Sequence, residues 1–198
     1  MKLAFWASVA VLATLPTVSL TACAPRAAQT QAAPAQGAGP GGPFALVNQD
    51  GRAVDQSVLK GKWSVVFFGY TYCPDFCPTT LTNLGKAMDQ LGPKANGAQV
   101  IFITIDPERD SPAAMKSYIS SRVFPKNIIG LTGTPAQIAQ VAKGYGVYYQ
   151  KQGTGSTYSM DHSTALYLMD PSGAFHGVIP DGPPDIDAKQ ISAAMSGA

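Results

Sequence analysis

Two near-continuous apolar runs constrain how this chain of 198 residues can fold. Trp63–Gly69 and Gln99–Ile105 are rich in β-branched and aromatic residues, without the polar alternation of a half-exposed strand. Runs of this kind are typical of strands buried on both faces, as in a parallel sheet covered by helices. Between them, Leu81, Leu84 and Met88 recur at helical spacing. The chain is therefore predicted to contain a strand–helix–strand unit of an α/β fold.

Capping and turn signals place the remaining elements. Ser111-Pro112 and Thr134-Pro135 pair a good N-cap residue with proline, which favours the first position of a helix. The other predicted elements are a leading hairpin around 48–51, a strand at 147–150, a mobile loop at 152–159, a hairpin turning at 170–173 and a final helix at 186–196. This order predicts a thioredoxin-like α/β fold, with a central mixed sheet flanked by helices and an N-terminal hairpin.

The first residues read as an export signal. Lys2 is followed by an uncharged, mostly apolar run from Leu3 to Ala22, which ends in the letters LTAC at Cys23. We expect residues 1–22 to be a lipoprotein signal peptide and Cys23 to carry the lipid, which would anchor the chain to a membrane. A cleaved secretory peptide and an uncleaved helix of about 20 residues are the alternatives. All three would place the rest of the chain outside the cytoplasm.

Composition divides the remainder into a tether and one domain. Residues 24–43 are mostly Ala, Pro, Gly and Gln and cannot bury a core, so residues 23–43 are predicted to form a disordered tether. Residues 44–198 are enough for one well-formed core. The formal net charge of +2 is spread without basic runs, which argues against nucleic acid as a partner.

Cys73 and Cys77 stand between the first apolar run and the first long helix. Open α/β sheets bind their ligands there, beyond the carboxyl ends of the strands. Because the residue before a proline disfavours helical geometry, we expect the helix to begin at Pro78, with Cys77 as its cap. Both sulfurs would then face the helix N-terminus, whose partial positive charge favours thiolate. A disulfide across so short a loop would add little stability, which favours a functional site over a structural bridge.

His162 is the third candidate ligand, because the approach to the final hairpin faces the cysteine loop in a thioredoxin-like sheet. Two thiolates and an imidazole suit Cu(I), and with added water they suit Cu(II). Zinc is the closest inorganic competitor. Met160 could add a thioether ligand, although methionine more often fills cores. His176, on the second strand of the hairpin, carries no sign of a site.

Acidic residues follow the second apolar run. We expect Asp110 and Ser111 to serve the exposed amides at the start of the next helix. Asp106 would lie near the cysteines, where it could orient the metal-binding imidazole or belong to a partner-docking surface.

Three blocks in this order resemble the Sco/SenC family of copper-delivery proteins: Gly69–Pro78 (GYTYCPDFCP), Thr104–Asp110 (TIDPERD) and Asp161–Ala165 (DHSTA). The resemblance implies that Cys73, Cys77 and His162 bind one copper ion, as Cu(I), Cu(II) or both. It also implies a periplasm-facing domain that helps to assemble the binuclear copper centre of cytochrome c oxidase. The implied partners are the copper-bearing oxidase subunit and, as a further candidate, another periplasmic copper chaperone. Asp106 matches the family's acidic block, where the role is less settled.

Two enzymatic hypotheses compete with a metallochaperone, which needs no turnover. A thiol-disulfide oxidoreductase would use Cys73 and Cys77 to reduce the cysteines of the oxidase copper site. Thioredoxin enzymes resemble one another in a cis-proline before the strand that faces the dithiol, whereas no proline lies between Pro135 and Pro171 here. A peroxiredoxin-like peroxidase would call for Pro and Thr upstream of one reactive cysteine, but Pro74 lies inside the pair.

Overall fold

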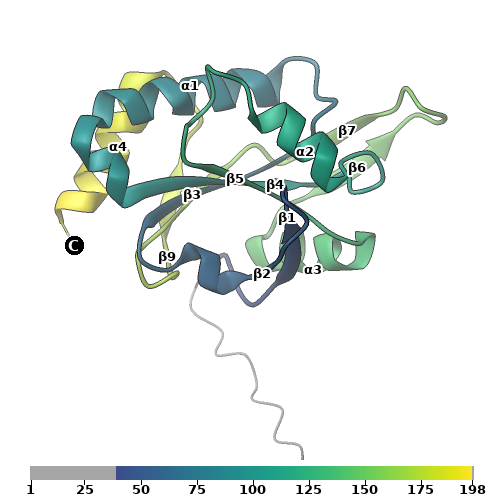
Figure 1. Ribbon diagram of the computed structural model, residues 1–198, viewed down its shortest axis with the longest axis horizontal. Helices are drawn as coiled ribbons and strands as arrows, with labels where there is room; N and C mark the ends of the chain where they lie inside the picture. Colours follow the sequence, from purple (N-terminus) through teal and green to yellow (C-terminus); the bar gives the residue numbers. More distant parts are fainter. Residues whose placement is uncertain (1–38, 198) are drawn as a thin grey trace, which may run out of the picture. The chain divides into compact units, whose positions relative to one another are not determined.

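The computed structural model describes residues 39–197. Seven strands form one mixed sheet at the centre of this domain (Figure 1). The order across the sheet is β2-β1-β5-β4-β3-β8-β9. β3 pairs in parallel with β4, and β4 with β5, while the outer pairings are antiparallel. The bounds of these strands are β1 Ala45–Asn48, β2 Ala53–Asp55, β3 Trp63–Gly69, β4 Ala98–Thr104, β5 Ile128–Thr132, β8 Leu166–Met169 and β9 Phe175–Ile179.

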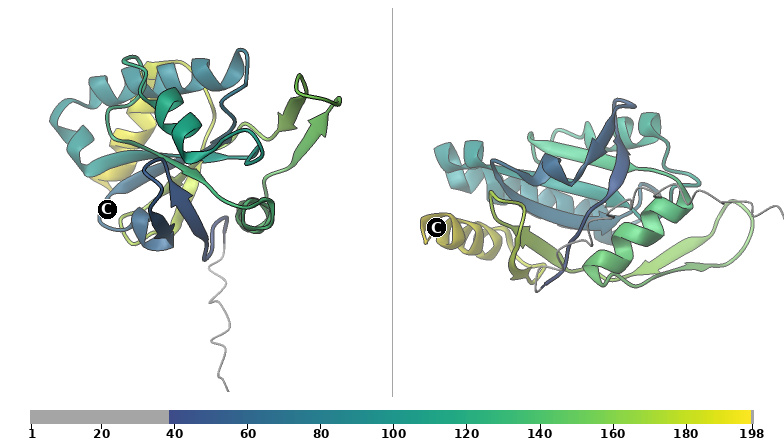
Figure 2. Two further views of the ribbon diagram at one scale, coloured as in Figure 1. Left: turned by 45° about the vertical axis from the view of Figure 1, so that its right-hand side comes forward. Right: turned by 90° about the horizontal axis from the view of Figure 1, so that it is seen from below.

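Helices cover both faces of this sheet. α1, α2 and α4 lie on one face and α3 on the other (Figures 1 and 2). Their bounds are α1 Phe76–Leu91, α2 Pro112–Ile119, α3 Pro135–Tyr145 and α4 Pro184–Ser196, with 3-10 turns at Gln56–Leu59 and Gly92–Gly97. The core follows the alternation of the strands: Phe67 and Phe102 stack on the side of α1, while Phe68 packs against Tyr145 of α3.

The predicted fold class is confirmed, because the two apolar runs form the adjacent parallel strands β3 and β4, buried at every residue. The leading hairpin and the final hairpin are also confirmed. Both predicted caps are present: the side chain of Ser111 accepts the N–H of Ala114, and Thr134 forms a capping box with Gln137. Local signals therefore place most elements correctly.

Three strands differ from the predictions. The strand predicted at 147–150 is β6, Tyr149–Gln152, which pairs with β7, Ser159–His162, to form a separate two-stranded ribbon. This pairing reduces the predicted loop to the connection at 153–158. Neither β5 nor β7 was predicted.

The signal segment, Cys23 and residues 24–38 of the predicted tether lie outside the described residues. Residues 39–43 lie against the domain, since the N–H of Gly41 donates to the carbonyl of Gly144 over 2.9 Å. Among residues 39–197, none of the helices combines the length and the apolar character that crossing a membrane would require.

Candidate metal centre

The two cysteines lie where β3 passes into α1. The N–H of Cys73 donates to the carbonyl of Tyr70 over 3.3 Å, which folds the chain into a turn after the strand. α1 begins at Phe76, so the predicted start at Pro78 is wrong and Cys77 lies in the first helical turn. The N–H of Cys77 donates to Sγ of Cys73 over 3.3 Å. The sulfur of Cys73 therefore takes the capping role that the sequence assigned to Cys77.

Cys77 is fully buried behind the end of β3. A side chain at Gly69 would place its Cβ 2.8 Å from the sulfur of Cys77 and 2.8 Å from the ring of Phe102. Such distances are sterically forbidden, so this position requires glycine for close approach. Cys73, by contrast, is only half-buried and opens toward solvent.

His162 ends β7 and brings its ring to the cysteines from the other side. Its Nε2 lies 3.7 Å from Sγ of Cys77, and its Nδ1 lies 2.8 Å from the carbonyl oxygen of Ser163. Because a carbonyl oxygen only accepts hydrogen bonds, Nδ1 carries a proton, and Nε2 is the ring nitrogen that faces Cys77. The rings of Phe67 and Tyr70 flank the imidazole at centroid distances of 6.4 and 6.1 Å.

The two thiols are chemically unequal. The pKa of Cys73 is lowered to about 4, chiefly by a hydrogen bond from the Cys77 side chain and further by His162, against the opposing effect of burial. The pKa of Cys77 is raised, because its thiol donates to Cys73 and because it is buried. At neutral pH the pair therefore holds one thiolate and one thiol.

Within residues 39–197, no three or more His, Cys, Asp and Glu side chains are gathered as a ready-made metal site. The side chains of Cys77 and His162 face one another directly. The sulfur of Cys73 contacts this pair through the hydrogen bond that it accepts from the backbone N–H of Cys77. Of the three predicted ligands, Cys77 and His162, 85 residues apart in the sequence, therefore meet directly, and Cys73 lies beside Cys77.

Asp110 does not have the predicted role. Its buried carboxylate accepts the backbone N–H and the hydroxyl of Thr71 and the hydroxyl of Thr104, while Ser111 alone caps α2. The carboxylate therefore fastens the loop before Cys73 to the end of β4. Burial raises the pKa of Asp110 against these hydrogen bonds.

Asp106 is 3% exposed and pairs with Arg109 and with the hydroxyl of Tyr158. The carbonyl of Ser163, rather than a carboxylate, lies against the imidazole of His162. Arg109 and Tyr158 were not singled out from the sequence. Arg109 could have been found from its place three residues after Asp106 in the same block, whereas no sequence signal marks Tyr158.

Met160 and His176, the remaining residues considered from the sequence, make no contact with the cysteine sulfurs among the contacts of the described residues. The backbone N–H of Met160 donates to the hydroxyl of Tyr70, and its half-buried side chain packs on the core. His176 lies on β9, with its ring edge-on to Trp63 at 4.9 Å.

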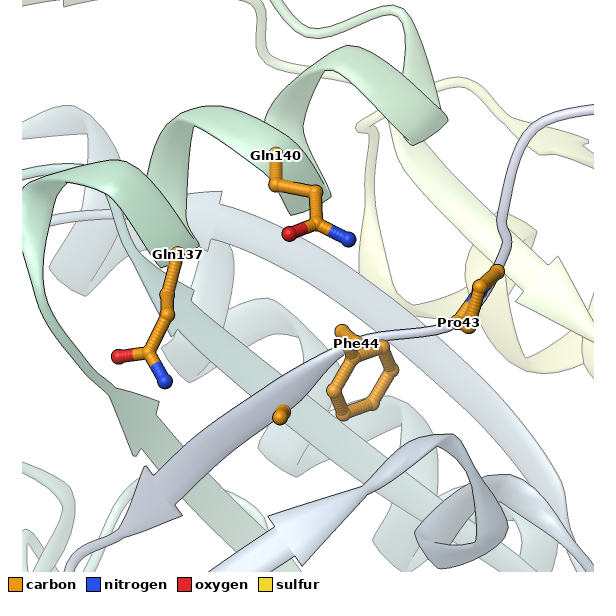
Figure 3. A pocket seen from close by; sticks show the side chains of 5 residues that line it. Pro43, Phe44, Gln137 and Gln140 are labelled. Atoms are coloured by element: carbon orange, nitrogen blue, oxygen red, sulfur yellow. The ribbon is translucent and has the colours of Figure 1, made fainter. Parts of the chain in front are cut away.

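A hollow between β1 and α3 offers no titratable group (Figure 3). Its lining consists of Pro43, Phe44, Ala45, Gln137 and Gln140. Gln137 already serves the cap of α3, so this hollow is no candidate for metal chemistry.

Comparison with known proteins gives consistent matches. The family model described as SCO1/SenC matches residues 32–196. The chain is 42% identical over 129 residues to the mitochondrial SCO1 homolog 1 of Arabidopsis thaliana, covering 64% of this chain and 38% of that protein. It is 36% identical over 156 residues to an SCO2-like protein of Rickettsia prowazekii, covering 76% and 73%. The match to the bovine mitochondrial SCO2 homolog covers 51% of that protein. This chain therefore spans about half or less of the length of these mitochondrial relatives.

Solved structures share the fold. Copper-bound ScoI of Bradyrhizobium japonicum is 44% identical, with a TM-score of 0.71 over 78% of this chain and 98% of that one. Copper-bound yeast Sco1 is 36% identical, with a TM-score of 0.74 over 81% and 90%.

Proposed function

Because the chain belongs to the SCO1/SenC family, we propose that it is a copper metallochaperone that helps to assemble the binuclear copper centre of cytochrome c oxidase. Cys73, Cys77 and His162 would bind one copper ion. The observation that carries the proposal is the 3.7 Å approach of His162 Nε2 to Cys77 Sγ, beside the Cys73 sulfur at the start of α1.

The donor set and its spacing suit a soft metal ion. Thiolates favour Cu(I), and imidazole is accepted by either oxidation state of copper. Metal–sulfur and metal–nitrogen bonds of about 2.3 and about 2.0 Å, meeting at about 120°, hold the two donor atoms roughly 3.7 Å apart. His162 and Cys77 already stand at this separation. Closing the site would also require the Cys73 sulfur to turn toward the metal and the Cys77 thiol to lose its proton.

The exposure of the site suits transfer to a partner. Cys73 and His162 are half-buried, while Cys77 is enclosed. A receiving protein could therefore reach the metal from the side of Cys73 and His162. The copper-bearing oxidase subunit is the proposed recipient, with another periplasmic copper chaperone as a further candidate partner.

We place the domain on the periplasmic side of a membrane, attached by a lipid at Cys23. This rests on the apolar run that ends at Cys23 and on the uncharged composition of residues 27–43. Such an anchor would keep the domain within reach of membrane-bound partners.

One observation favours a second function for the same residues. A half-buried thiolate at Cys73 beside a protonated, buried Cys77 is the usual pattern of a thiol-disulfide oxidoreductase. The Cys73 thiolate would attack a disulfide of the oxidase copper site and form a mixed disulfide. That attack releases the first partner thiol; Cys77, losing its proton, would then attack Sγ of Cys73 and displace the second partner sulfur, so that both partner cysteines are reduced and Cys73–Cys77 is oxidised.

The test is an anaerobic titration of the reduced chain with Cu(I) against a competing chelator. We expect one tight equivalent in the wild type and in His176→Ala, and a marked loss of affinity in Cys73→Ala and His162→Ala. Affinity unchanged by His162→Ala would remove that residue from the site. Absence of tight binding in the wild type would contradict the metallochaperone and favour the oxidoreductase.

A further inference from the structure

The β6–β7 ribbon raises the question of what holds His162 in place. Within residues 39–197 the ribbon has no strand pairing with the central sheet, and it extends away from the body of the domain (Figure 2). His162 is the last residue of β7. Its distance from Cys77 therefore depends on side chains that join the ribbon to the body.

Burial along β7 and at Tyr158, the residue directly before it, shows which side chains these are. Tyr158 is 7% exposed, Met160 and His162 are half-buried, and Ser159 and Asp161 are exposed. Because alternate residues of a strand share a face, Tyr158, Met160 and His162 all face the body. Tyr158 lies about 13 Å before His162 along an extended chain, and it is the most buried of the three.

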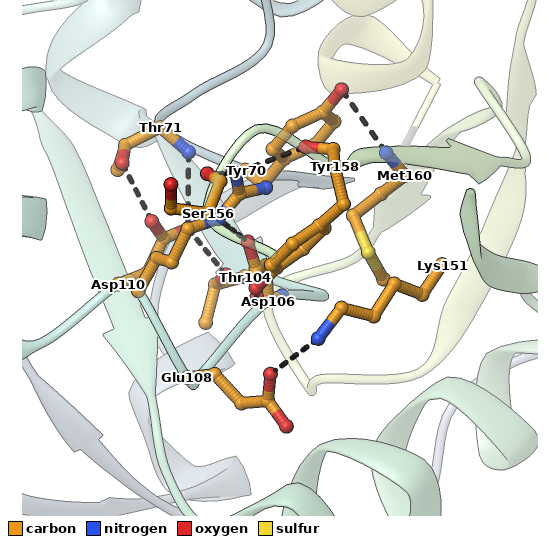
Figure 4. A network of polar contacts seen from close by, with 11 residues as sticks. Tyr70, Thr71, Thr104, Asp106, Glu108, Asp110, Lys151, Ser156, Tyr158 and Met160 are labelled. Carbon is orange, nitrogen blue, oxygen red and sulfur yellow. Dashed lines mark hydrogen bonds and ion pairs between the residues drawn. The ribbon is translucent and has the colours of Figure 1, made fainter. Parts of the chain in front are cut away.

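Tyr158 contacts Arg109 and Asp106 of the loop after β4. Figure 4 shows Tyr158 beside Asp106. Its hydroxyl donates to Oδ1 of Asp106 over 2.6 Å, and its ring lies under the guanidinium of Arg109 at 3.6 Å. Nη1 of Arg109 donates to the carbonyl oxygen of Tyr158 over 3.0 Å. Nε of Arg109 pairs with the other carboxylate oxygen of Asp106. Each of the three side chains is thus fixed by the other two.

The same guanidinium also touches the cysteine loop. It lies 4.7 Å from the ring centre of Tyr72, the residue directly before Cys73, and 5.8 Å from that of Tyr70. Tyr70 in turn accepts the N–H of Met160. Arg109 therefore stands between the segment that carries the cysteines and the ribbon that carries the histidine.

Lys151 of the ribbon places its ammonium 3.8 Å from the ring centre of Tyr158, and it also pairs with Glu108 over 2.8 Å. Both side chains of this ion pair are largely exposed, at 43% and 62%, and exposed pairs contribute little because water screens them. The buried contacts of Tyr158 should consequently dominate the attachment of the ribbon.

We propose that Arg109, Asp106 and Tyr158 form a positioning unit that holds the β6–β7 ribbon so that His162 faces Cys77. The inference rests on the proposed role of His162 as a copper ligand. The unit contributes no donor atom to the metal. It restricts the motion of the imidazole before copper arrives, so less order must be gained on binding.

The experiment compares Cu(I) affinities of the reduced full chain in the wild type, Tyr158→Ala, Tyr158→Phe and Tyr148→Phe. We expect Tyr158→Ala to bind one equivalent about tenfold more weakly, as for groups that orient metal-binding histidines. Tyr158→Phe keeps the ring under Arg109 and should lie between Tyr158→Ala and wild type. Tyr148→Phe, which removes only an exposed hydroxyl that donates to Gln150, should match wild type.

A double-mutant comparison separates positioning from general damage. If Tyr158 acts through His162, adding Tyr158→Ala to His162→Ala should weaken Cu(I) binding no further. A metal-free readout accompanies it: amide hydrogen exchange at residues 159–162 should accelerate in Tyr158→Ala, while exchange in β3 should not change.

The outcomes distinguish the two proposals. Wild-type protein that binds no Cu(I) tightly overturns the proposed function and this inference with it. Tight wild-type binding with unchanged affinity in Tyr158→Ala overturns the inference alone. The inference is also overturned if Tyr158→Ala lowers Cu(I) affinity equally in the wild type and in His162→Ala, because the effect of Tyr158 would then not depend on the imidazole.

Discussion

Cys73 and Cys77 are one helical turn apart, yet the fold gives them opposite properties. Cys73 accepts the N–H of Cys77 and the proton of its thiol, so its negative charge is stabilised at the start of α1. Cys77 lies in an apolar enclosure that disfavours charge. The difference follows from which sulfur faces the helix N-terminus, and the spacing of the two cysteines alone does not reveal it.

We predict that Cys73 reacts with iodoacetamide at a nearly constant rate between pH 6 and 8. With a pKa of about 4, Cys73 is already thiolate over this range, whereas an ordinary thiol gains about tenfold in rate per pH unit. Peptide mapping by mass spectrometry would follow Cys73 in the reduced, metal-free chain. In Cys77→Ala the hydrogen-bond donor is lost, so the pKa of Cys73 should rise and its rate should become pH-dependent. A tenfold increase per pH unit in the wild type would contradict the assignment.

The carboxylate of Asp110 stabilises the approach to the cysteines. In Asp110→Ala, three donors of Thr71 and Thr104 lose their acceptor in a buried place. Because unsatisfied buried donors keep their desolvation penalty, we expect unfolding to become easier by about 3 kcal/mol. Urea denaturation measures the change, with the exposed Asp89→Ala as the control. Equal stability of the two variants would show that the hydrogen bonds of Asp110 are replaced by water.

At the scale of elements, local signals succeed where burial or capping leaves a pattern in the sequence. β3 and β4 are continuous apolar runs because they are buried on both faces. β5 escapes prediction because Gly130 interrupts its run. At that glycine α2 packs closely, because a Cβ would lie 3.1 Å from the side chain of Met115 and 3.3 Å from that of Ile119.

The ribbon is harder to predict for another reason. β6 and β7 are mostly exposed and carry no apolar run, so their pairing leaves little trace in composition. Cys73, Cys77 and His162 are recognisable because their motifs are local. The contact of Arg109 with Tyr158 spans 49 residues between two loops, and no periodic pattern marks it.

Packing of α1 gives a prediction at this scale. A side chain at Gly85 would bring its Cβ to 2.2 Å from the carbonyl oxygen of Val123. Alanine favours helices over glycine by about 1 kcal/mol, but displacing a packed backbone costs about 1–3 kcal/mol or more. We therefore expect Gly85→Ala to lower the free energy of unfolding. Gly177→Ala, where nothing lies within 4 Å, is the matched control and should change it little.

For the molecule as a whole, the C-terminal segment closes the domain by packing α4 onto α1. The hydroxyl of Thr80, one turn after Cys77, donates to Asp181 over 2.9 Å. Asp187 of α4 is fully buried, and both of its carboxylate oxygens lack a hydrogen-bond partner within the described residues. Burial, together with the charges of Asp181 and Asp185, raises the pKa of Asp187 from 3.8 to about 7.

This raised pKa makes global stability depend on pH. The folded state holds the proton of Asp187 more tightly than the unfolded state, so its neutral form contributes stability that is fully present below about pH 4. That contribution is lost as the pH rises through about 7, where burial of the charged carboxylate becomes costly. Unfolding near neutral pH should therefore become easier with increasing pH on account of this one group.

Asp187→Asn tests the linkage, because the amide keeps the size of the side chain but cannot ionise. Urea denaturation at pH 5, 6, 7 and 8 should show a flatter dependence of stability on pH in Asp187→Asn than in the wild type. The difference in slope can reach at most about 1.4 kcal/mol per pH unit, the value for one proton. Asp89→Asn, an exposed carboxylate on α1, should keep the wild-type slope. Parallel curves for Asp187→Asn and the wild type would mean that Asp187 ionises in the folded protein as it does in the unfolded chain, with water reaching the contact between α1 and α4.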